Sequence, residues 1–116
     1  MTRVLFVCVQ NAGRSQLAQA LYERRGGEAR SAGSQPADEI HEAVAEALEE
    51  IGAAGQRPRA LTDDDLAWAD FVVSLGCGDA VAADVEWNFA DPVGMCLEEV
   101  RELRASLDRK VRELPL

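Results

Sequence analysis

The chain has 116 residues, a formal net charge of −9 and three cysteines. A chain of this length has room for one hydrophobic core, so we expect a single domain over residues 1–116. The acidic excess argues against a nucleic-acid partner, because nucleic-acid affinity rests on neutralising phosphates. No stretch is long and apolar enough to cross a membrane, and the N-terminal apolar run lacks a small-residue cleavage site, which predicts a cytoplasmic protein.

The first part of the chain predicts a strand, a helix and a second strand. Residues 4–7 are a continuous apolar run, typical of a strand buried on both faces. A helical pattern follows from Ser15 and stops at Gly26 and Gly27. Residues 29–32 then predict a short strand.

The middle of the chain predicts two more helices separated by a loop. Asp38 is expected to cap a helix that ends at Gly52, and its apolar positions fall on one face at Ile40, Val44, Leu48 and Ile51. Residues 53–60 are predicted to be a loop. Thr62 and the acidic residues after it fit a variant of the capping box, which opens a short helix.

The last part predicts two strands and a long helix. Residues 71–75 form an apolar run, and alternating apolar side chains over 85–89 indicate a short, half-exposed strand. Leucines and valines then mark an amphipathic helix from Leu97 to Leu114. Strands that alternate with helices predict parallel pairing and a three-layer α/β domain.

The three cysteines, Cys8, Cys77 and Cys96, are far apart in the sequence. There is no CxxC motif, and His41 is the only histidine, so the sequence predicts no metal site. A disulfide scaffold does not suit a cytosolic chain. Reactive thiol chemistry remains open.

Cys8 ends the first strand and precedes a tight loop that opens a helix. Six successive N–H groups, from Val9 to Arg14, can curl around an anion, because Asn11 and Gly13 readily adopt left-handed conformations. The following helix points its positive end at the same place, and Arg14 can add two parallel hydrogen bonds. Such a nest binds an oxyanion despite the negative net charge of the protein. The predicted oxyanion-binding residues are Val9, Gln10, Asn11, Ala12, Gly13, Arg14 and Ser15.

The same positive field favours an ionised, nucleophilic sulfur at Cys8, and the Ser15 hydroxyl is placed to donate to it. The alternative is that Cys8 is a small core residue and Arg14 begins a solvated helix face. A cysteine and an arginine at this spacing are weak evidence alone. The strand before them and the helix after them favour the functional interpretation.

The string Cys8-Val9-Gln10-Asn11-Ala12-Gly13-Arg14-Ser15 resembles the phosphate-binding loop of the low-molecular-weight protein tyrosine phosphatase superfamily. Residues 4–18, 31–33, 76–79 and 87–92 together resemble the arsenate reductases built on that fold. The resemblance covers nearly the whole chain. It implies a four-stranded parallel sheet flanked by helices, with arsenate as substrate and phosphate or sulfate as its mimics.

The resemblance also implies residue roles in the loop. Cys8 matches the nucleophile that attacks arsenate, and Arg14 matches the clamp on the oxyanion. Asn11 matches the residue that pins the loop, and Ser15 matches the partner of the thiolate.

Two further roles follow from the resemblance outside the loop. Asp91, before Pro92, matches the general acid that protonates the leaving oxygen, although Asp and Pro are also common in simple turns. Cys77 matches the resolving cysteine, which attacks Cys8 sulfur so that arsenite leaves and a Cys8–Cys77 disulfide remains. Cys77 could instead be a buried filler between two glycines.

The chain departs from this pattern in its cysteines. The three-cysteine reductases have another cysteine a few residues after the one that matches Cys77, but residues 79–84 contain none. Cys96, which we expect to be a packing residue, is one substitute. The other is an external reductant: thioredoxin, mycothiol with mycoredoxin, or glutathione with glutaredoxin. Gln19 and Arg59 occupy the approximate positions of potassium ligands in some relatives, so we predict no potassium site.

Three functions remain open from the sequence. Arsenate reduction is favoured by Cys77 and by residues 87–92. Phosphatase activity on phosphotyrosine or a small phosphoester would use the same loop and Asp91, but Val93 and Gly94 stand where the phosphatases have tyrosines after the Asp-Pro pair. A non-catalytic oxyanion or arsenite sensor would explain the missing cysteine. For all three we expect a monomer without a bound cofactor, no membrane contact, and for the reductase a redoxin or low-molecular-weight thiol as partner.

Overall fold

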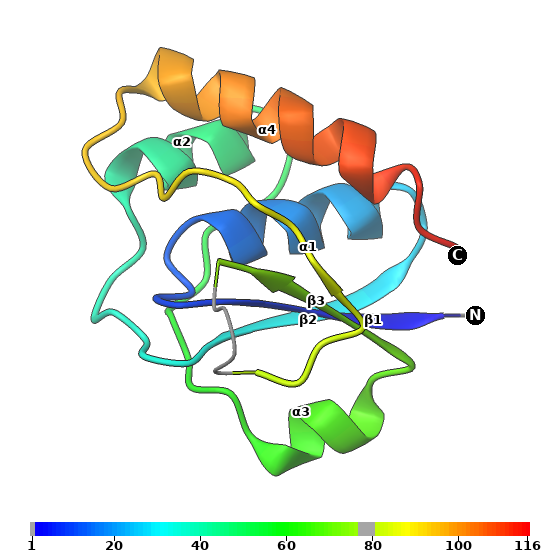
Figure 1. The fold of residues 1–116 in the computed structure, drawn as a ribbon. Coiled ribbons are helices and arrows are strands. Elements are labelled where there is room, and N and C mark those ends of the chain that lie inside the picture. The colour runs from blue at the N-terminus through cyan, green and yellow to red at the C-terminus, as the bar shows by residue number, and fades with distance from the viewer. Residues whose placement is uncertain (1, 77–80) are drawn as a thin grey trace.

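A four-stranded parallel sheet lies at the centre of the computed structural model, which describes residues 2–76 and 81–116 (Figure 1). The strand order is β2-β1-β3-β4, and the strands are β1 (Arg3–Cys8), β2 (Glu28–Gly33), β3 (Phe71–Leu75) and β4 (Val85–Glu86). Residues 4–7 in β1 have no exposed surface, as their continuous apolar run predicts. The α/β class and the four-stranded parallel sheet are therefore confirmed.

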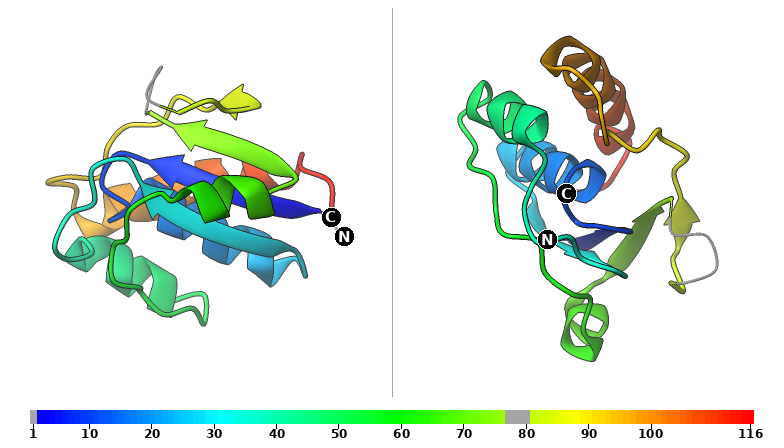
Figure 2. Two further views of the ribbon diagram at one scale, coloured as in Figure 1. Left: turned by 90° about the horizontal axis from the view of Figure 1, so that it is seen from below. Right: turned by 90° about the vertical axis from the view of Figure 1, so that its left-hand side faces the viewer.

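Three helices cover one face of the sheet, and one short helix lies on the other face (Figures 1 and 2). The first layer contains α1 (Arg14–Arg24), α2 (Glu42–Glu49) and α4 (Leu97–Val111), and the opposite layer contains α3 (Asp63–Trp68). The longest, α4, has 15 residues. Within residues 2–76 and 81–116, no helix has both the length and the apolar character that a bilayer crossing requires.

The strand order changes direction at β1. The chain leaves β1 through α1 to pair β2 on one side, and β3 later pairs β1 on the other side. In open parallel sheets a crevice forms at the carboxyl ends of the strands where the strand order reverses. That point is the end of β1, which carries Cys8.

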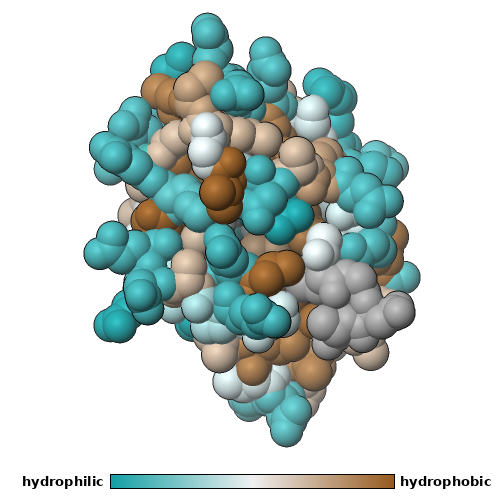
Figure 3. Space-filling model, turned by 60° about the vertical axis from the view of Figure 1, so that its left-hand side comes forward, coloured by the Kyte–Doolittle hydropathy of each residue, from teal (hydrophilic) through white to brown (hydrophobic). Residues whose placement is uncertain are grey.

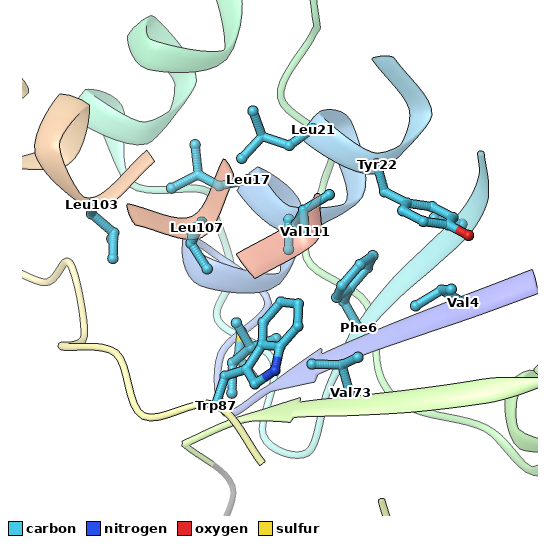
Figure 4. Close-up of a cluster of buried hydrophobic side chains, with 14 of the residues drawn as sticks. Val4, Phe6, Leu17, Leu21, Tyr22, Val73, Trp87, Leu103, Leu107 and Val111 are labelled. Carbon is cyan, nitrogen blue, oxygen red and sulfur yellow. The ribbon is translucent and has the colours of Figure 1, made fainter. Parts of the chain in front are cut away.

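The main core lies between the sheet and the three-helix layer (Figure 4). Phe6 meets Tyr22 edge to face with ring centroids 6.1 Å apart, and its centroid is also 6.1 Å from that of Trp87. Trp87 in turn meets Phe89 edge to face at 6.5 Å. This aromatic chain anchors the segment after β4 to the core, so the segment that carries Asp91 begins from a fixed point.

The second helix begins later than its predicted cap. Asp38 was expected to cap it, but α2 starts at Glu42 with His41 at the N-cap position. His41 N–H instead donates to the carbonyl of Ala12 at 3.1 Å, so residues before it run along the Cys8 loop. The prediction of Asp38 as the cap is wrong because a tertiary hydrogen bond holds this segment out of the helix.

The remaining boundaries are largely as predicted. Thr62 and Asp65 form the capping box of α3. Only Val85–Glu86 pair as a strand, so the expected strand over 85–89 is shorter. The last helix ends at Val111, and Leu114 is buried beyond it. The expectation that Cys96 is a packing residue is wrong, because Cys96 is exposed at the N-cap of α4.

Candidate active site

The loop after β1 turns the carbonyl groups of residues 8–13 outward, and each of them accepts a hydrogen bond. Four accept backbone N–H groups of residues 34–41, one accepts a side-chain amide, and one accepts the first helical turn. The pairs are Cys8 O with Ser34 N at 3.1 Å, Val9 O with Gln35 N at 2.8 Å, Gln10 O with Ala37 N at 3.0 Å, Asn11 O with Gln16 Nε2 at 2.7 Å, Ala12 O with His41 N at 3.1 Å, and Gly13 O with Leu17 N at 3.0 Å.

These outward carbonyls determine where the amides point. In a trans peptide the C=O and the next N–H point in opposite directions, so six outward carbonyls turn the N–H groups of residues 9–14 toward the inside of the loop. Asn11 N–H donates to the Cys8 sulfur. Five other loop amides donate no hydrogen bond to an acceptor in the described part of the chain: those of Val9, Gln10, Ala12, Gly13 and Arg14. A ring of inward amides at a helix N-terminus is suited to an oxyanion.

The Cys8 sulfur lies at the base of this ring. It is 3.0 Å from Ser15 Oγ and 3.2 Å from the amide nitrogen of Asn11, and the residue is 2% exposed. Ser15 Oγ accepts a bond from Asn11 Nδ2, which leaves its own hydrogen free to point at the sulfur. The sulfur thus lies at the start of α1, in contact with the Ser15 hydroxyl and the Asn11 amide.

Asn11 is held in a left-handed conformation by its own side chain. Its φ is 53°, and within residues 2–76 and 81–116 it is the one non-glycine residue with positive φ. Asn11 Nδ2 donates to Ser15 Oγ at 2.7 Å and to Ser31 Oγ at 3.1 Å, while Oδ1 accepts Arg59 N–H at 3.0 Å. Asn tolerates this conformation better than most residues, and the three bonds fix it.

Three polar residues support Asn11 in a role that the sequence pattern did not indicate. Besides Ser31 and Arg59, Gln16 bridges the Asn11 carbonyl to the 53–60 loop, because its Nε2 also donates to Gln56 O and its Oε1 accepts Gln56 N–H. The sequence contains only a weak signal for this buried polar cluster. Gln16 and Gln19 are three residues apart on α1, so they share the helix face that turns out to be buried and polar.

Asp65 holds Arg59 in place and thereby supports Asn11 indirectly. The two side chains pair at 2.7 Å and 3.0 Å. Burial raises the pKa of Asp65, but hydrogen bonds from Arg59 and Thr62 outweigh it and hold this pKa at about 2. Among the described residues, no three His, Cys, Asp or Glu side chains form a group that could hold a metal ion.

We expect Asp65→Asn to lower the free energy of unfolding by roughly 1–2 kcal/mol at pH 7, after discounting for the partial exposure of Arg59. The folded-state pKa of Asp65 is depressed, so this contribution is present above about pH 4 and is lost as the pH falls toward 2. Urea unfolding of both proteins from pH 7 to pH 2.5 measures it. Asp64→Asn is the control, because the Asp64 side chain is 87% exposed. An equal loss in both variants, or one that does not shrink in acid, would contradict this role.

Arg14 lies across the open side of the ring. It is 7% exposed, its Nη1 donates to the carbonyl of Phe89 at 3.1 Å, and its Nη2 is 3.7 Å from Asp91 Oδ2. Arg14 Nε is buried and has no hydrogen-bond partner among the described residues. The guanidinium thus keeps donors for a bidentate contact with an oxyanion.

Asp91 lies above the loop because the residue after it packs on the loop itself. A Cβ added to Gly13 would be 2.3 Å from Pro92 Cγ, so the Asp-Pro turn rests directly against Gly13. Asp91 Oδ1 accepts Val93 N–H at 3.0 Å, and its side chain is 46% exposed. The structure therefore places Asp91 near Arg14. Asp91 belongs to a turn, and it also lies beside the Cys8 loop.

The structure does not place every predicted residue. Cys77 lies outside the described residues.

The face at the carboxyl ends of the strands is mostly hydrophilic, with small apolar areas between the polar side chains (Figure 3). Because the chain is acidic overall, attraction for an anion has to arise locally from the loop amides and Arg14.

Comparisons with known proteins converge on one fold and two activities. A family model described as low molecular weight phosphotyrosine protein phosphatase matches residues 3–84. A Halobacterium salinarum protein with the provisional name arsenate reductase is 38% identical, over 97% of this chain and 90% of its own. A thioredoxin-dependent arsenate reductase of Corynebacterium glutamicum has a TM-score of 0.79 and 38% identity, over 97% of this chain and 59% of its own. An arginine phosphatase of Geobacillus stearothermophilus has a TM-score of 0.81 and 28% identity, over 97% and 89%.

Proposed function

The chain belongs to the low molecular weight phosphotyrosine protein phosphatase family, and we propose that within this family it reduces arsenate to arsenite. The observation that carries the proposal is the Cys8 sulfur at the base of a ring of inward amides, closed by Arg14. The name of the Halobacterium salinarum relative and the activity of the Corynebacterium glutamicum enzyme favour arsenate as substrate.

In the first step the Cys8 sulfur attacks arsenic and an arsenic–oxygen bond breaks. Asp91 donates a proton to the leaving oxygen, which departs as water or hydroxide. The loop amides and Arg14 carry the charge on the oxygens that remain, in a site that is preorganised because the carbonyls of the loop are already bonded. A Cys8–arsenic(V) adduct results.

In the second step another thiolate attacks the Cys8 sulfur. A sulfur–sulfur bond forms, the sulfur–arsenic bond breaks, and its electron pair reduces arsenic(V) to arsenic(III), which leaves as arsenite. The attacking thiolate is Cys77 or an external thiol. An external reductant (thioredoxin, glutathione with glutaredoxin, or mycothiol with mycoredoxin) then reduces the disulfide by thiol–disulfide exchange.

Phosphatase activity is the second candidate. The loop and Asp91 suit hydrolysis of a phosphoester as well, and the arginine phosphatase of Geobacillus stearothermophilus has a similar fold. Val93 follows Pro92 and is 57% exposed, so no aromatic side chain stands there to hold a substrate ring. This favours a small inorganic oxyanion.

The decisive assay couples arsenate reduction to each of the three reductant systems separately, with hydrolysis of para-nitrophenyl phosphate measured in parallel. We expect arsenate-dependent oxidation of at least one reductant. Hydrolysis without any arsenate reduction would establish the phosphatase instead. Arsenate binding without turnover in any system would establish the non-catalytic sensor.

Cys77→Ser tests the resolving step. We expect this variant to release arsenite more slowly with thioredoxin, since only an external thiol can then attack the adduct, while hydrolysis of para-nitrophenyl phosphate is unchanged. Cys96→Ser is the matched control, because Cys96 is exposed at the start of α4. Unchanged reduction in Cys77→Ser together with loss in Cys96→Ser would assign the resolving role to Cys96.

A further inference from the structure

We propose that Gly76 is a positioning residue for the Arg14 guanidinium, and that any side chain at position 76 weakens oxyanion binding. The inference rests on the oxyanion site of the proposed function. Gly76 follows β3 and precedes Cys77, and it is not part of the Cys8 loop. It belongs to the string 76–79 that resembles the arsenate reductases, but the resemblance assigns it no role.

The contact between Gly76 and Arg14 is closer than a side chain would allow. A Cβ built on Gly76 would lie 2.3 Å from Arg14 Nη1, 3.1 Å from its Cζ and 3.5 Å from its Nη2. The three nearest atoms are thus all in the guanidinium. Gly76 also has a φ of +84°, a conformation that glycine adopts without steric cost.

The guanidinium is held between two stretches of main chain. Gly76 borders Nη1 on one side, and the carbonyl of Phe89 accepts a bond from the same Nη1 at 3.1 Å. Gly76 is itself fixed, because its N–H donates to Glu86 Oε1 at 2.9 Å. This arrangement leaves Arg14 Nε, which is buried and unbonded within the described residues, available to the oxyanion.

A side chain at position 76 would displace the Arg14 guanidinium more than it would destabilise the fold. The atoms in its way belong to the far end of a flexible arginine side chain, which can move at little cost to folding. A guanidinium that has moved no longer presents two parallel donors to the anion. Loss of one charge-assisted hydrogen bond corresponds to roughly a ten- to hundred-fold weaker affinity.

The test is the affinity for inorganic phosphate, measured by isothermal titration calorimetry at pH 7. Gly76→Ala is expected to bind phosphate about ten- to hundred-fold more weakly than the unmodified protein. Gly52→Ala is the matched control, because Gly52 has a φ of +75° but nothing within 4 Å of its built Cβ. We expect the control to keep its phosphate affinity and to show the same fall in melting temperature as Gly76→Ala.

A double-mutant cycle with Arg14→Lys then tests whether Gly76 acts through the guanidinium. Lysine lacks the planar group that borders Gly76, so Gly76→Ala should cost no more than about two-fold in the Arg14→Lys background. An equal loss in both backgrounds overturns the inference. Gly76→Asn repeats the test with a residue that tolerates positive φ, should the alanine variant fail to fold.

The outcomes separate this inference from the proposed function. If the unmodified protein binds phosphate and Gly76→Ala binds it as well as Gly52→Ala does, the positioning role is wrong and the oxyanion site stands. If the unmodified protein does not bind phosphate, both are wrong.

Discussion

Cys8→Ser is expected to abolish arsenate reduction and phosphoester hydrolysis while leaving phosphate binding intact. A serine hydroxyl is a poor nucleophile without an adjacent base, and removing a sole nucleophile typically costs a factor of about 10⁴ or more. The loop should persist, because its carbonyls bond residues 34–41, Gln16 and Leu17 rather than the sulfur. The measurement pairs initial rates of both reactions with calorimetric phosphate binding.

The stability of the Cys8→Ser variant provides the internal control. Serine can keep the contacts that Cys8 makes with Ser15 Oγ and Asn11 N, so we expect little change in unfolding free energy. Cys96→Ser should retain phosphoester hydrolysis in the same assays, because that reaction needs no second thiol and Cys96 lies at the start of α4, outside the Cys8 loop. If Cys8→Ser still reduced arsenate at the wild-type rate, the nucleophile would have to lie elsewhere.

The features predicted well from the sequence are those that neighbouring residues determine. The apolar run over residues 4–7 predicts β1, and the loop from Cys8 to Arg14 is local, with Asn11 at positive φ as its residue type allows. The Thr62 capping box is also local and is confirmed. In each case the sequence pattern and the tertiary structure favour the same conformation.

The features that could not be predicted depend on contacts between distant residues. Asp38 is a good helix cap in isolation, but a hydrogen bond from His41 to Ala12 moves the helix start to Glu42. Asn11 is fixed by Arg59, which lies 48 residues away, and nothing near Arg59 in the sequence indicates that bond. The burial of Gln16 against Gln56 has the same character.

Asp91 belongs to a turn and also lies next to Arg14. An Asp-Pro pair is compatible with a plain turn, and the structure does contain that turn, since Asp91 Oδ1 accepts Val93 N–H. The packing of Pro92 on Gly13 and the 3.7 Å approach of Asp91 to Arg14 make the position suitable for proton transfer to a leaving oxygen. A kinetic test distinguishes a turn residue from a general acid at this position.

Asp91→Asn is expected to slow the first chemical step about 10²- to 10⁴-fold, because the leaving oxygen loses its proton donor. Asparagine keeps a carbonyl oxygen for Val93 N–H, so the turn should remain. Stopped-flow or single-turnover measurement of Cys8 adduct formation gives the rate of this step.

The matched control for Asp91→Asn is Asp70→Asn. Asp70 pairs with Arg3 at 3.7 Å, the same distance as Asp91 to Arg14, and its side chain is 50% exposed. It lies before β3, at the opposite end of the strands from Cys8. Asp70→Asn should leave adduct formation unchanged. If Asp91→Asn also left the rate unchanged, Asp91 would be a turn residue, and the leaving oxygen would take its proton from water.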